Sequence, residues 1–298
     1  MTYQLRRQPN GSFALHIPEL GETMHPRLGP WEEARRLYIH GTGLPALLSA
    51  SGPGDVVVFD VGLGGAANAL AAIALAQQER REGRRARPLR VVSFENDADA
   101  PRFALANAQA LGYMRGFEPA LGALLAAGEW KDEGVSWELR LGDFTRGIAE
   151  EPRRADAVFF DPFSPRGNPA MWTVAVFENI YRCRRPGLPM RLATYSTAFG
   201  ARAAMLLAGF YAGEGPELAD GRRATVASSD FSALDAPLGP PWLARWRRDR
   251  EPWPPGTDPA QHRRVREQLV VHPQWSHFSA PAAQEPPPGR RPPPRRRR

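Results

Sequence analysis

The feature that most constrains the fold is a buried strand followed at once by a glycine-rich turn and a helix. Residues 56–59 form the unbroken apolar run Val-Val-Val-Phe, typical of a parallel strand covered on both faces. The turn Asp60-Val61-Gly62-Leu63-Gly64 follows, and a helix is predicted over residues 66–77. Glycines let the backbone turn sharply and approach a ligand closely. This pattern predicts a nucleotide-binding α/β unit, but it fits a nicotinamide enzyme and an S-adenosylmethionine enzyme equally.

The next two predicted strands also end in acidic residues. Residues 90–94 lead to Glu95, whose carboxylate can accept hydrogen bonds from ribose hydroxyls. Residues 136–141 lead to Asp143, which can accept a hydrogen bond from an adenine amino group while Phe144 flanks the ring. Asp143 fits equally well as the N-cap of a short helix that follows it. Both interpretations of Asp143 stay open.

A fourth strand, residues 157–160, stops at Asp161-Pro162. Proline cannot donate to a sheet ladder and keeps the preceding residue extended, so Asp161 should lie at the carboxyl end of the strand, with Phe163 just beyond it. A carboxylate followed by a proline and an aromatic ring can hold an amine, because the acid accepts its protons and the ring covers the flat group that carries it. The alternative is a strand-to-turn junction with a capping aspartate.

Strands and helices alternate along the chain, which predicts a mainly parallel sheet with helices on both faces. A strand over residues 191–195 and a closing pair over 210–214 and 224–227 complete a seven-stranded, Rossmann-like sheet. The glycine turn and the three acidic strand ends then share one rim of the sheet. This layout is that of a class I S-adenosylmethionine-dependent methyltransferase, whereas a hydride-transferring enzyme gives no reason for Asp143 or Asp161.

Charge and composition divide the chain into three parts. Residues 1–50 are predicted to form a cap segment, with a hairpin around Asn10-Gly11 and a helix from Pro30. Residues 51–235 are predicted to form the methyltransferase domain. Residues 236–298 are rich in proline and arginine, and from Pro240 onward thirteen arginines face five acidic residues, so the net charge of +7 belongs to this extension. A basic tail favours an acidic polymer such as nucleic acid. Because Lys131 is the only lysine, a coding bias towards arginine is the alternative.

The predicted environment is a reducing cytoplasm. The N-terminus has no secretory signal, and no apolar run reaches the length of a membrane span. The single cysteine, Cys183, excludes an intramolecular disulfide, and no metal site is expected. Residues 281–298 are expected to be disordered. Trp242, Trp246 and Trp253 are expected to dock the middle of the extension.

The stretch from Asp161 to Thr173, DPFSPRGNPAMWT, resembles the signature of the methyltransferase domain of the tRNA 5-methylaminomethyl-2-thiouridine biosynthesis protein family. The resemblance covers roughly residues 20 to 228. Its other elements are the Asp60 to Gly64 turn with Asn68, the acid Glu95, the Glu32-Glu33 pair, and Gly209-Phe210-Tyr211 followed by Gly221-Arg222-Arg223.

The resemblance implies an enzyme that uses S-adenosylmethionine to methylate the aminomethyl group of a tRNA wobble uridine. Asp161 would orient the amine and help its proton leave, and Phe163 would stack on the uracil. The implied cofactor-binding residues are Asp60, Gly62, Gly64, Asn68, Glu95, Asp143 and Phe144. The implied substrate-binding residues are Glu33, Pro162, Arg222 and Arg223. The alternative for Glu33 is a solvated ion pair with Arg36, which lies on the same helical face.

Three questions about function stay open in the sequence. The bifunctional relatives carry a flavin-dependent oxidase domain, for which these 298 residues leave no room, so a separate enzyme is expected to supply the amine. A transferase for another small amine, such as an aminopropyltransferase, would share the sheet. A non-catalytic RNA-binding module that kept the fold would also share it, although Asp161 and the glycine turn are intact.

Overall fold

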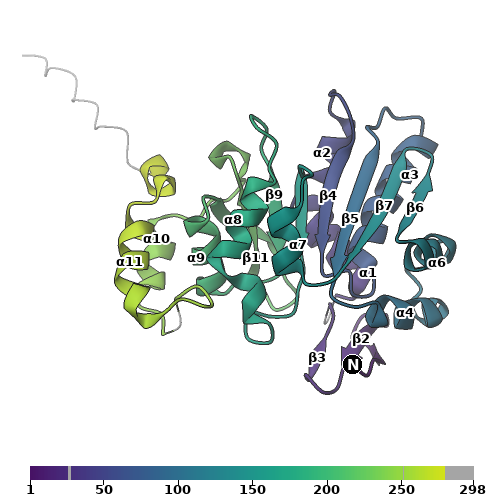
Figure 1. Ribbon diagram of the computed structural model, residues 1–298, viewed down its shortest axis with the longest axis horizontal. Helices are drawn as coiled ribbons and strands as arrows, with labels where there is room; N and C mark the ends of the chain where they lie inside the picture. Colours follow the sequence, from purple (N-terminus) through teal and green to yellow (C-terminus); the bar gives the residue numbers. More distant parts are fainter. Residues whose placement is uncertain (26–27, 251, 279–298) are drawn as a thin grey trace, which may run out of the picture.

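The computed structural model describes residues 1–25, 28–250 and 252–278, and within them a large central sheet is covered by helices on both faces (Figure 1). The sheet has eight strands in the order β10-β11-β9-β8-β4-β5-β7-β6. The strands are β4 (Val56–Val61), β5 (Leu89–Glu95), β6 (Glu129–Asp132), β7 (Val135–Leu141), β8 (Ala157–Phe160), β9 (Arg191–Thr194), β10 (Tyr211–Glu217) and β11 (Arg223–Ser228). The five central strands from β9 to β7 are parallel, which confirms the mainly parallel α/β fold.

The prediction of seven strands was wrong by one. The additional strand is β6, which pairs antiparallel with β7 at the edge of the sheet, with Glu129 opposite Glu138 and Asp132 opposite Val135. Residues 129–132 read EWKD and show no apolar alternation, so the strand has no signal of its own. It forms because the turn at Gly134 folds the chain back onto β7.

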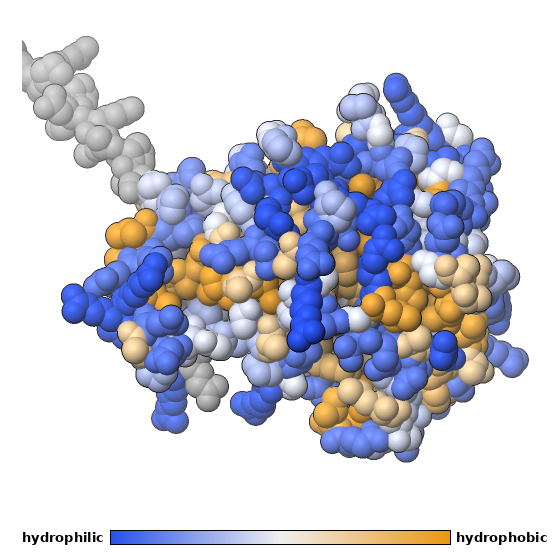
Figure 2. All heavy atoms as spheres, viewed as in Figure 1, coloured by the Kyte–Doolittle hydropathy of each residue, from blue (hydrophilic) through white to orange (hydrophobic). Residues whose placement is uncertain are grey.

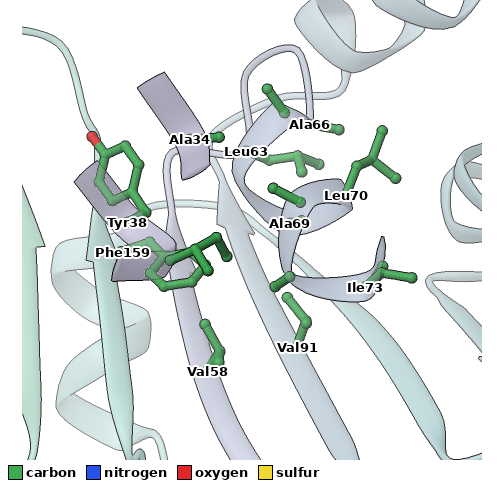
Figure 3. Close-up of a cluster of buried hydrophobic side chains, with 14 of the residues drawn as sticks. Ala34, Tyr38, Val58, Leu63, Ala66, Ala69, Leu70, Ile73, Val91 and Phe159 are labelled. Atoms are coloured by element: carbon green, nitrogen blue, oxygen red, sulfur yellow. The ribbon is translucent and has the colours of Figure 1, made fainter. Parts of the chain in front are cut away.

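Side chains of β4 alternate between two apolar layers. Val56 and Val58 point into the layer that holds helix α3 (Ala67–Arg81) and the π-helix η1 (Ala34–His40), where Leu70, Tyr38 and Phe159 pack together (Figure 3). Val57 and Phe59 point into the opposite layer, which contains α7 (Phe144–Glu150), α8 (Val174–Arg182) and α9 (Phe199–Leu207). Burial on both faces fixes the register of the strand, because a shift by one residue would exchange the two layers.

The remaining helices continue this arrangement. They are α1 (Pro30–Glu33), α2 (Leu44–Ser49), α4 (Asp99–Ala106), α5 (Ala108–Leu111), α6 (Glu118–Ala127), α10 (Pro240–Trp246) and α11 (His262–Val270), with 3₁₀ turns η2 (Pro169–Trp172), η3 (Phe231–Ala233), η4 (Pro259–Gln261) and η5 (Pro273–Phe278). Thr173 separates the 3₁₀ turn η2 from helix α8. The side chain of Thr173 accepts a hydrogen bond from Val176 N and starts α8 as a new helix.

The N-terminal segment forms a small antiparallel sheet and then a helix, as predicted. Strands β1 (Gln4–Arg7) and β2 (Phe13–Ile17) make the hairpin, and β3 (Glu22–Thr23) adds a third strand. Glu22 of β3 accepts a hydrogen bond from Ser164, in the turn after β8. Helix α1 continues into η1, which ends at Gly41. The segment thereby lies over the carboxyl ends of the central strands.

The described part of the C-terminal extension is helical and packs on the main fold. Trp242 and Trp246 of α10 are buried against α9 and α11, and Trp253 lies at the edge of the same cluster, which confirms the predicted docking. Gln274 is fully buried and bonds through its side chain to Ala212 of the edge strand β10, so the extension covers that edge. The stretch 281–298, predicted to be disordered, lies outside the described residues.

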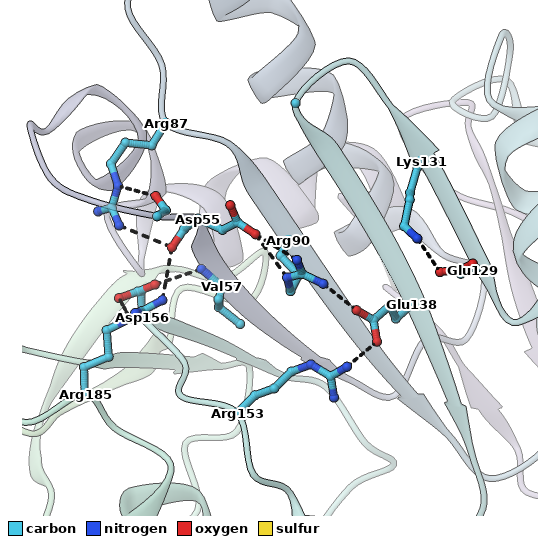
Figure 4. Close-up of polar contacts among 12 residues, drawn as sticks. Asp55, Val57, Arg87, Arg90, Glu129, Lys131, Glu138, Arg153, Asp156 and Arg185 are labelled. Carbon is cyan, nitrogen blue, oxygen red and sulfur yellow. Dashed lines mark hydrogen bonds and ion pairs between the residues drawn. The ribbon is translucent and has the colours of Figure 1, made fainter.

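A network of ion pairs crosses the amino ends of the strands, at the edge of the sheet opposite the glycine turn (Figure 4). Arg90 of β5 bridges Asp55 and Glu138, and Arg153 also pairs with Glu138. Asp156 accepts a hydrogen bond from Val57 N and pairs with Arg185. Within the described ranges, no helix is long and apolar enough to cross a membrane.

Candidate active site

The glycine turn after β4 lies directly against the end of β8. Gly62 has φ +88°, and a Cβ there would stand 2.6 Å from the carbonyl oxygen of Asp161. Gly64 has φ +49°, and a Cβ there would stand 3.2 Å from the sulfur of Met24, in the N-terminal segment. A side chain would be strained at both positions, and at Gly62 it would also collide with backbone atoms, whereas at Gly64 it would only crowd the flexible side chain of Met24. The turn brings β4, β8 and the N-terminal segment together.

Asp161 lies at the carboxyl end of β8, as predicted, and its carboxylate is nearly buried. Its backbone N–H donates to Val61 O, which fixes it beside the glycine turn. Asn68 Nδ2 donates to Asp161 Oδ2 at 2.8 Å, so the asparagine predicted for the cofactor contacts the predicted catalytic aspartate. Burial raises the pKa of Asp161 to about 6, although the charge of His25 and the hydrogen bond from Asn68 oppose the rise.

His25 is the residue of this site that the sequence interpretation missed. It follows β3, and its side chain is 9% exposed between two carboxylates. His25 Nδ1 lies 3.2 Å from Glu33 Oε1, and Nε2 lies 3.7 Å from Asp161 Oδ2. Burial by itself lowers the pKa of His25, but the charges of Asp161 and Glu33 outweigh it and raise the pKa to about 9.

The predicted alternative of a solvated Glu33–Arg36 pair was wrong. Glu33 turns inward to His25 and is 10% exposed, while Arg36 pairs with Glu32 on the outer face of the helix. Glu33 points inward because His25, in the N-terminal segment, is a buried partner for its carboxylate. The sequence pattern of the helix does not reveal this partner. Glu33 therefore faces Asp161 across His25, and its contact with a substrate stays a prediction.

Two tyrosines complete the surroundings of Asp161. The hydroxyl of Tyr38 is buried and faces the carboxylate of Asp161, and its hydrogen bond helps to lower the pKa of Asp161. Burial and then the charge of Asp161 raise the pKa of Tyr38 well above the usual range, so the hydroxyl stays protonated as a donor. Tyr195 Oη donates to Pro162 O at 2.9 Å and holds the turn that carries Phe163. Neither tyrosine was predicted for the site.

The residues predicted for the cofactor offer acceptors at the glycine turn. Asp60 is fully buried, and its Oδ2 accepts a hydrogen bond from Ser93 Oγ at 2.6 Å. Its Oδ1, like Asn68 Oδ1, is buried without a partner among the described residues. Burial raises the pKa of Asp60 to about 7. Glu95 ends β5, accepts a hydrogen bond from Gly64 N, and has its pKa raised by burial.

This set of donors and acceptors fits S-adenosylmethionine. Buried polar atoms normally find partners, so the two unpartnered oxygens are the acceptors that we expect to bind the ammonium of the cofactor. Glu95 keeps a carboxylate at the strand end where a ribose hydroxyl donates in nucleotide-binding sheets. Both contacts are predictions for the bound state.

Asp143 and Phe144 occupy the start of α7. Asp143 accepts hydrogen bonds from Thr145 N and Thr145 Oγ1, and these bonds lower its pKa. The N-cap alternative is thus confirmed. Phe144 is packed in the core against Phe94, with ring centroids 5.1 Å apart. Contact of either residue with an adenine ring stays a prediction.

The remaining predicted residues lie at the rim. Phe163 is partly exposed, and its carbonyl accepts a hydrogen bond from Trp172 Nε1. Arg222 pairs with Asp220 and donates to Thr197, while Arg223 pairs with Glu214. The start of β11 pairs with the end of β9, so these arginines share the carboxyl edge of the sheet with Asp161 but lie beyond β9.

The fold and this edge define a class I S-adenosylmethionine-dependent methyltransferase. Residues 121–230 match the family described as "S-adenosyl-L-methionine-dependent methyltransferase". The chain is 31% identical over 235 residues to the tRNA 5-methylaminomethyl-2-thiouridine biosynthesis bifunctional protein MnmC of Paracidovorax citrulli, covering 76% of this chain and 34% of that protein. It is 28% identical over 260 residues to MnmC of Pseudomonas aeruginosa strain UCBPP-PA14, covering 84% and 36%.

Among solved structures, MNMC2 from Aquifex aeolicus shares the fold, with a TM-score of 0.68 at 22% identity over 91% of this chain and 84% of that one. The chain spans about a third of the length of the curated relatives it matches. It is an S-adenosylmethionine-dependent methyltransferase related to the MnmC proteins.

Proposed function

We propose that the protein transfers a methyl group to the aminomethyl nitrogen of a tRNA wobble uridine, forming 5-methylaminomethyluridine. The observation that carries this proposal is the cluster of Asp161, Glu33 and Asn68 at the glycine turn, which offers a buried pair of carboxylates to a cationic amine. The names of the MnmC relatives supply the tRNA context.

In the proposed reaction, S-adenosylmethionine supplies a methyl group on a sulfonium, which is already activated for attack. Gly62 and Gly64 let the cofactor approach the backbone, and Asp60, Asn68 and Glu95 accept its hydrogen bonds. Asp161 holds the amine in line with the methyl group, so that much of the acceleration comes from positioning. Tyr38 directs its hydroxyl at the carboxylate of Asp161, and Phe163 and Pro162 support the uracil. Asn68 keeps the carboxylate of Asp161 in place.

The proposed partner is tRNA, and the exposed arginines of the C-terminal helices fit its phosphates. Six arginines here are exposed: Arg245 on α10, Arg247 and Arg248 directly after it, and Arg263, Arg264 and Arg266 on α11. The end of the molecule that these helices form carries strongly hydrophilic side chains (Figure 2). Arginine side chains bind phosphates and supply affinity without sequence readout. Arg222 and Arg223 extend the positive charge to the edge of the site.

We further propose that the three predicted segments of the chain have separate roles. Residues 1–50 close over the site, residues 51–235 carry out the methyl transfer, and residues 236–298 help to bind RNA. A separate enzyme would supply the aminomethyl group, and the reaction would take place in the cytoplasm with the tRNA.

The test is transfer of labelled methyl from S-adenosylmethionine to two tRNA pools, one with aminomethyl wobble uridines and one unmodified. We expect label only in the first pool. Asp161→Asn should abolish transfer while the affinity for S-adenosylmethionine, measured by calorimetry, changes little. Label in neither pool, together with methylation of a free small amine, would replace tRNA by that amine. Labelling of both pools would refute the role of the aminomethyl group.

A further inference from the structure

His25 and Glu33 form a buried pair whose contact is not needed for Asp161 to hold the substrate amine. The 3.2 Å separation of His25 Nδ1 and Glu33 Oε1 is within hydrogen-bond range, and an ionised carboxylate only accepts, so Nδ1 carries the hydrogen. This bond orients the ring. His25 Nε2 then faces Asp161 Oδ2 at 3.7 Å, too far for a good hydrogen bond. A histidine oriented by one carboxylate, with its other nitrogen facing the carboxylate proposed to hold the substrate amine, is placed where a general base would act.

We propose that Glu33 and His25 form the base that takes the proton from the substrate ammonium held by Asp161. This inference rests on the proposed function and assigns its proton acceptor. An N–H bond of the ammonium breaks and a bond from that proton to His25 Nε2 forms, leaving a lone pair on the amine. The lone pair forms the new C–N bond with the methyl carbon, while the C–S bond breaks and its electrons stay on sulfur. The imidazolium later returns its proton to water.

The charged groups around His25 all make its ring more basic. Asp161 at the end of β8, Glu33 on α1 and Asp60 on β4 are acidic, and each raises the pKa of the ring. Tyr38 of η1 and Asn68 of α3 also face Asp161, and both are neutral. With a pKa of about 9, His25 approaches the basicity of a primary alkylamine such as lysine, about 10.4. At neutral pH this pKa leaves most of the free enzyme with His25 protonated, so the ring must first release its Nε2 proton to water, and methyl transfer should rise with pH towards 9.

The dyad can be tested without turnover, by nuclear magnetic resonance titration of the cofactor-free full chain labelled in its six histidines. The His25 signal is assigned by its loss in His25→Gln. We expect it to titrate well above the usual histidine value of about 6.5, and to move towards that value in Glu33→Gln. Glu32→Gln is the matched control, because Glu32 is the neighbouring glutamate and pairs outward with Arg36.

An ordinary pKa for His25, or one that Glu33→Gln leaves in place, would overturn the dyad. If Glu33→Gln does not fold, Asp161→Asn serves as the second variant, because Asp161 is the other carboxylate that raises the pKa of His25.

Methyl transfer provides the second readout. His25→Gln should lower kcat by about 10²- to 10⁴-fold, the usual contribution of a general base, with S-adenosylmethionine affinity unchanged. Added imidazole should restore part of the rate of His25→Ala, in proportion to its neutral form. His40→Ala, at the exposed end of η1, is the control that should keep full activity.

The two proposals fail in different ways. A wild-type protein that methylates no aminomethyl tRNA refutes the proposed function, while the titration still tests the His25–Glu33 pair. An active wild type with an equally active His25→Gln refutes the dyad alone.

Discussion

Replacing Gly62 by alanine tests whether the glycine turn and the Asp161 carboxylate form one rigid unit. The substitution has two costs that the structure separates. The first is the positive φ of +88°, which disfavours any residue with a Cβ by about 1–2 kcal/mol. The second is steric, because the new Cβ would lie 2.6 Å from Asp161 O and 3.0 Å from its carbonyl carbon, which are backbone atoms that cannot rotate away. Such overpacking costs about 1–3 kcal/mol.

Gly221→Ala is the matched control. Gly221 has φ +80°, close to that of Gly62, and a Cβ there would meet nothing within 4 Å. We expect urea denaturation to show a loss of about 1–2 kcal/mol for Gly221→Ala and about 2–5 kcal/mol for Gly62→Ala.

The difference between the two variants measures the collision with Asp161. Because that collision can be relieved only by moving the end of β8 or the turn, Gly62→Ala should also weaken S-adenosylmethionine binding in calorimetry and lower kcat. Equal destabilisation of the two variants, with cofactor binding intact in both, would refute the claim that the turn is packed against Asp161.

Three further predictions probe other parts of the structure. Asn68→Ala removes a hydrogen bond that lowers the pKa of Asp161, so the Asp161 carboxyl, which titrates at about pH 6 in the wild type, should titrate at higher pH in a nuclear magnetic resonance titration of the variant. Trp246→Ala should destabilise the whole protein by about 3–5 kcal/mol in urea denaturation, since its fully buried side chain joins α10 to the core, and a separately melting extension would contradict this. Arg247→Glu with Arg264→Glu should weaken tRNA binding and flatten its salt dependence, with S-adenosylmethionine binding as the unaffected control.

The parts of the site that the sequence predicts are those governed by local backbone chemistry. Pro162 ends β8 and thereby places Asp161 at the rim, whatever surrounds it. The glycines at 62 and 64 report a turn with positive φ, which the structure has at both positions. Burial of β4 on two faces follows from its unbroken apolar run. Each of these inferences needs only a few adjacent residues.

Other features of the structure depend on hydrogen bonds and packing that the sequence pattern leaves open. Asp143 is compatible with a cap and with an adenine contact; in the structure it caps α7, and its contact with adenine stays a prediction. Strand β6 carries no strand pattern and depends on pairing with β7. His25 stands in a short connection between β3 and α1, where a histidine has no local signature. Its role appears only when the N-terminal segment is folded over Asp161.

Glu33 shows why a helical face cannot be interpreted alone. Glu32 and Glu33 are neighbours in sequence, yet one pairs with Arg36 at the surface and the other is buried against His25. A buried carboxylate is costly unless it is paired, so Glu33 tolerates its position only because His25 reaches it from the N-terminal segment. The same imidazole also faces Asp161, which the glycine turn holds in place. The three residues are therefore interdependent, because loss of His25 would leave the buried carboxylates of Glu33 and Asp161 facing one another. The position of the N-terminal segment over the site consequently depends on the charge of His25, which that segment carries.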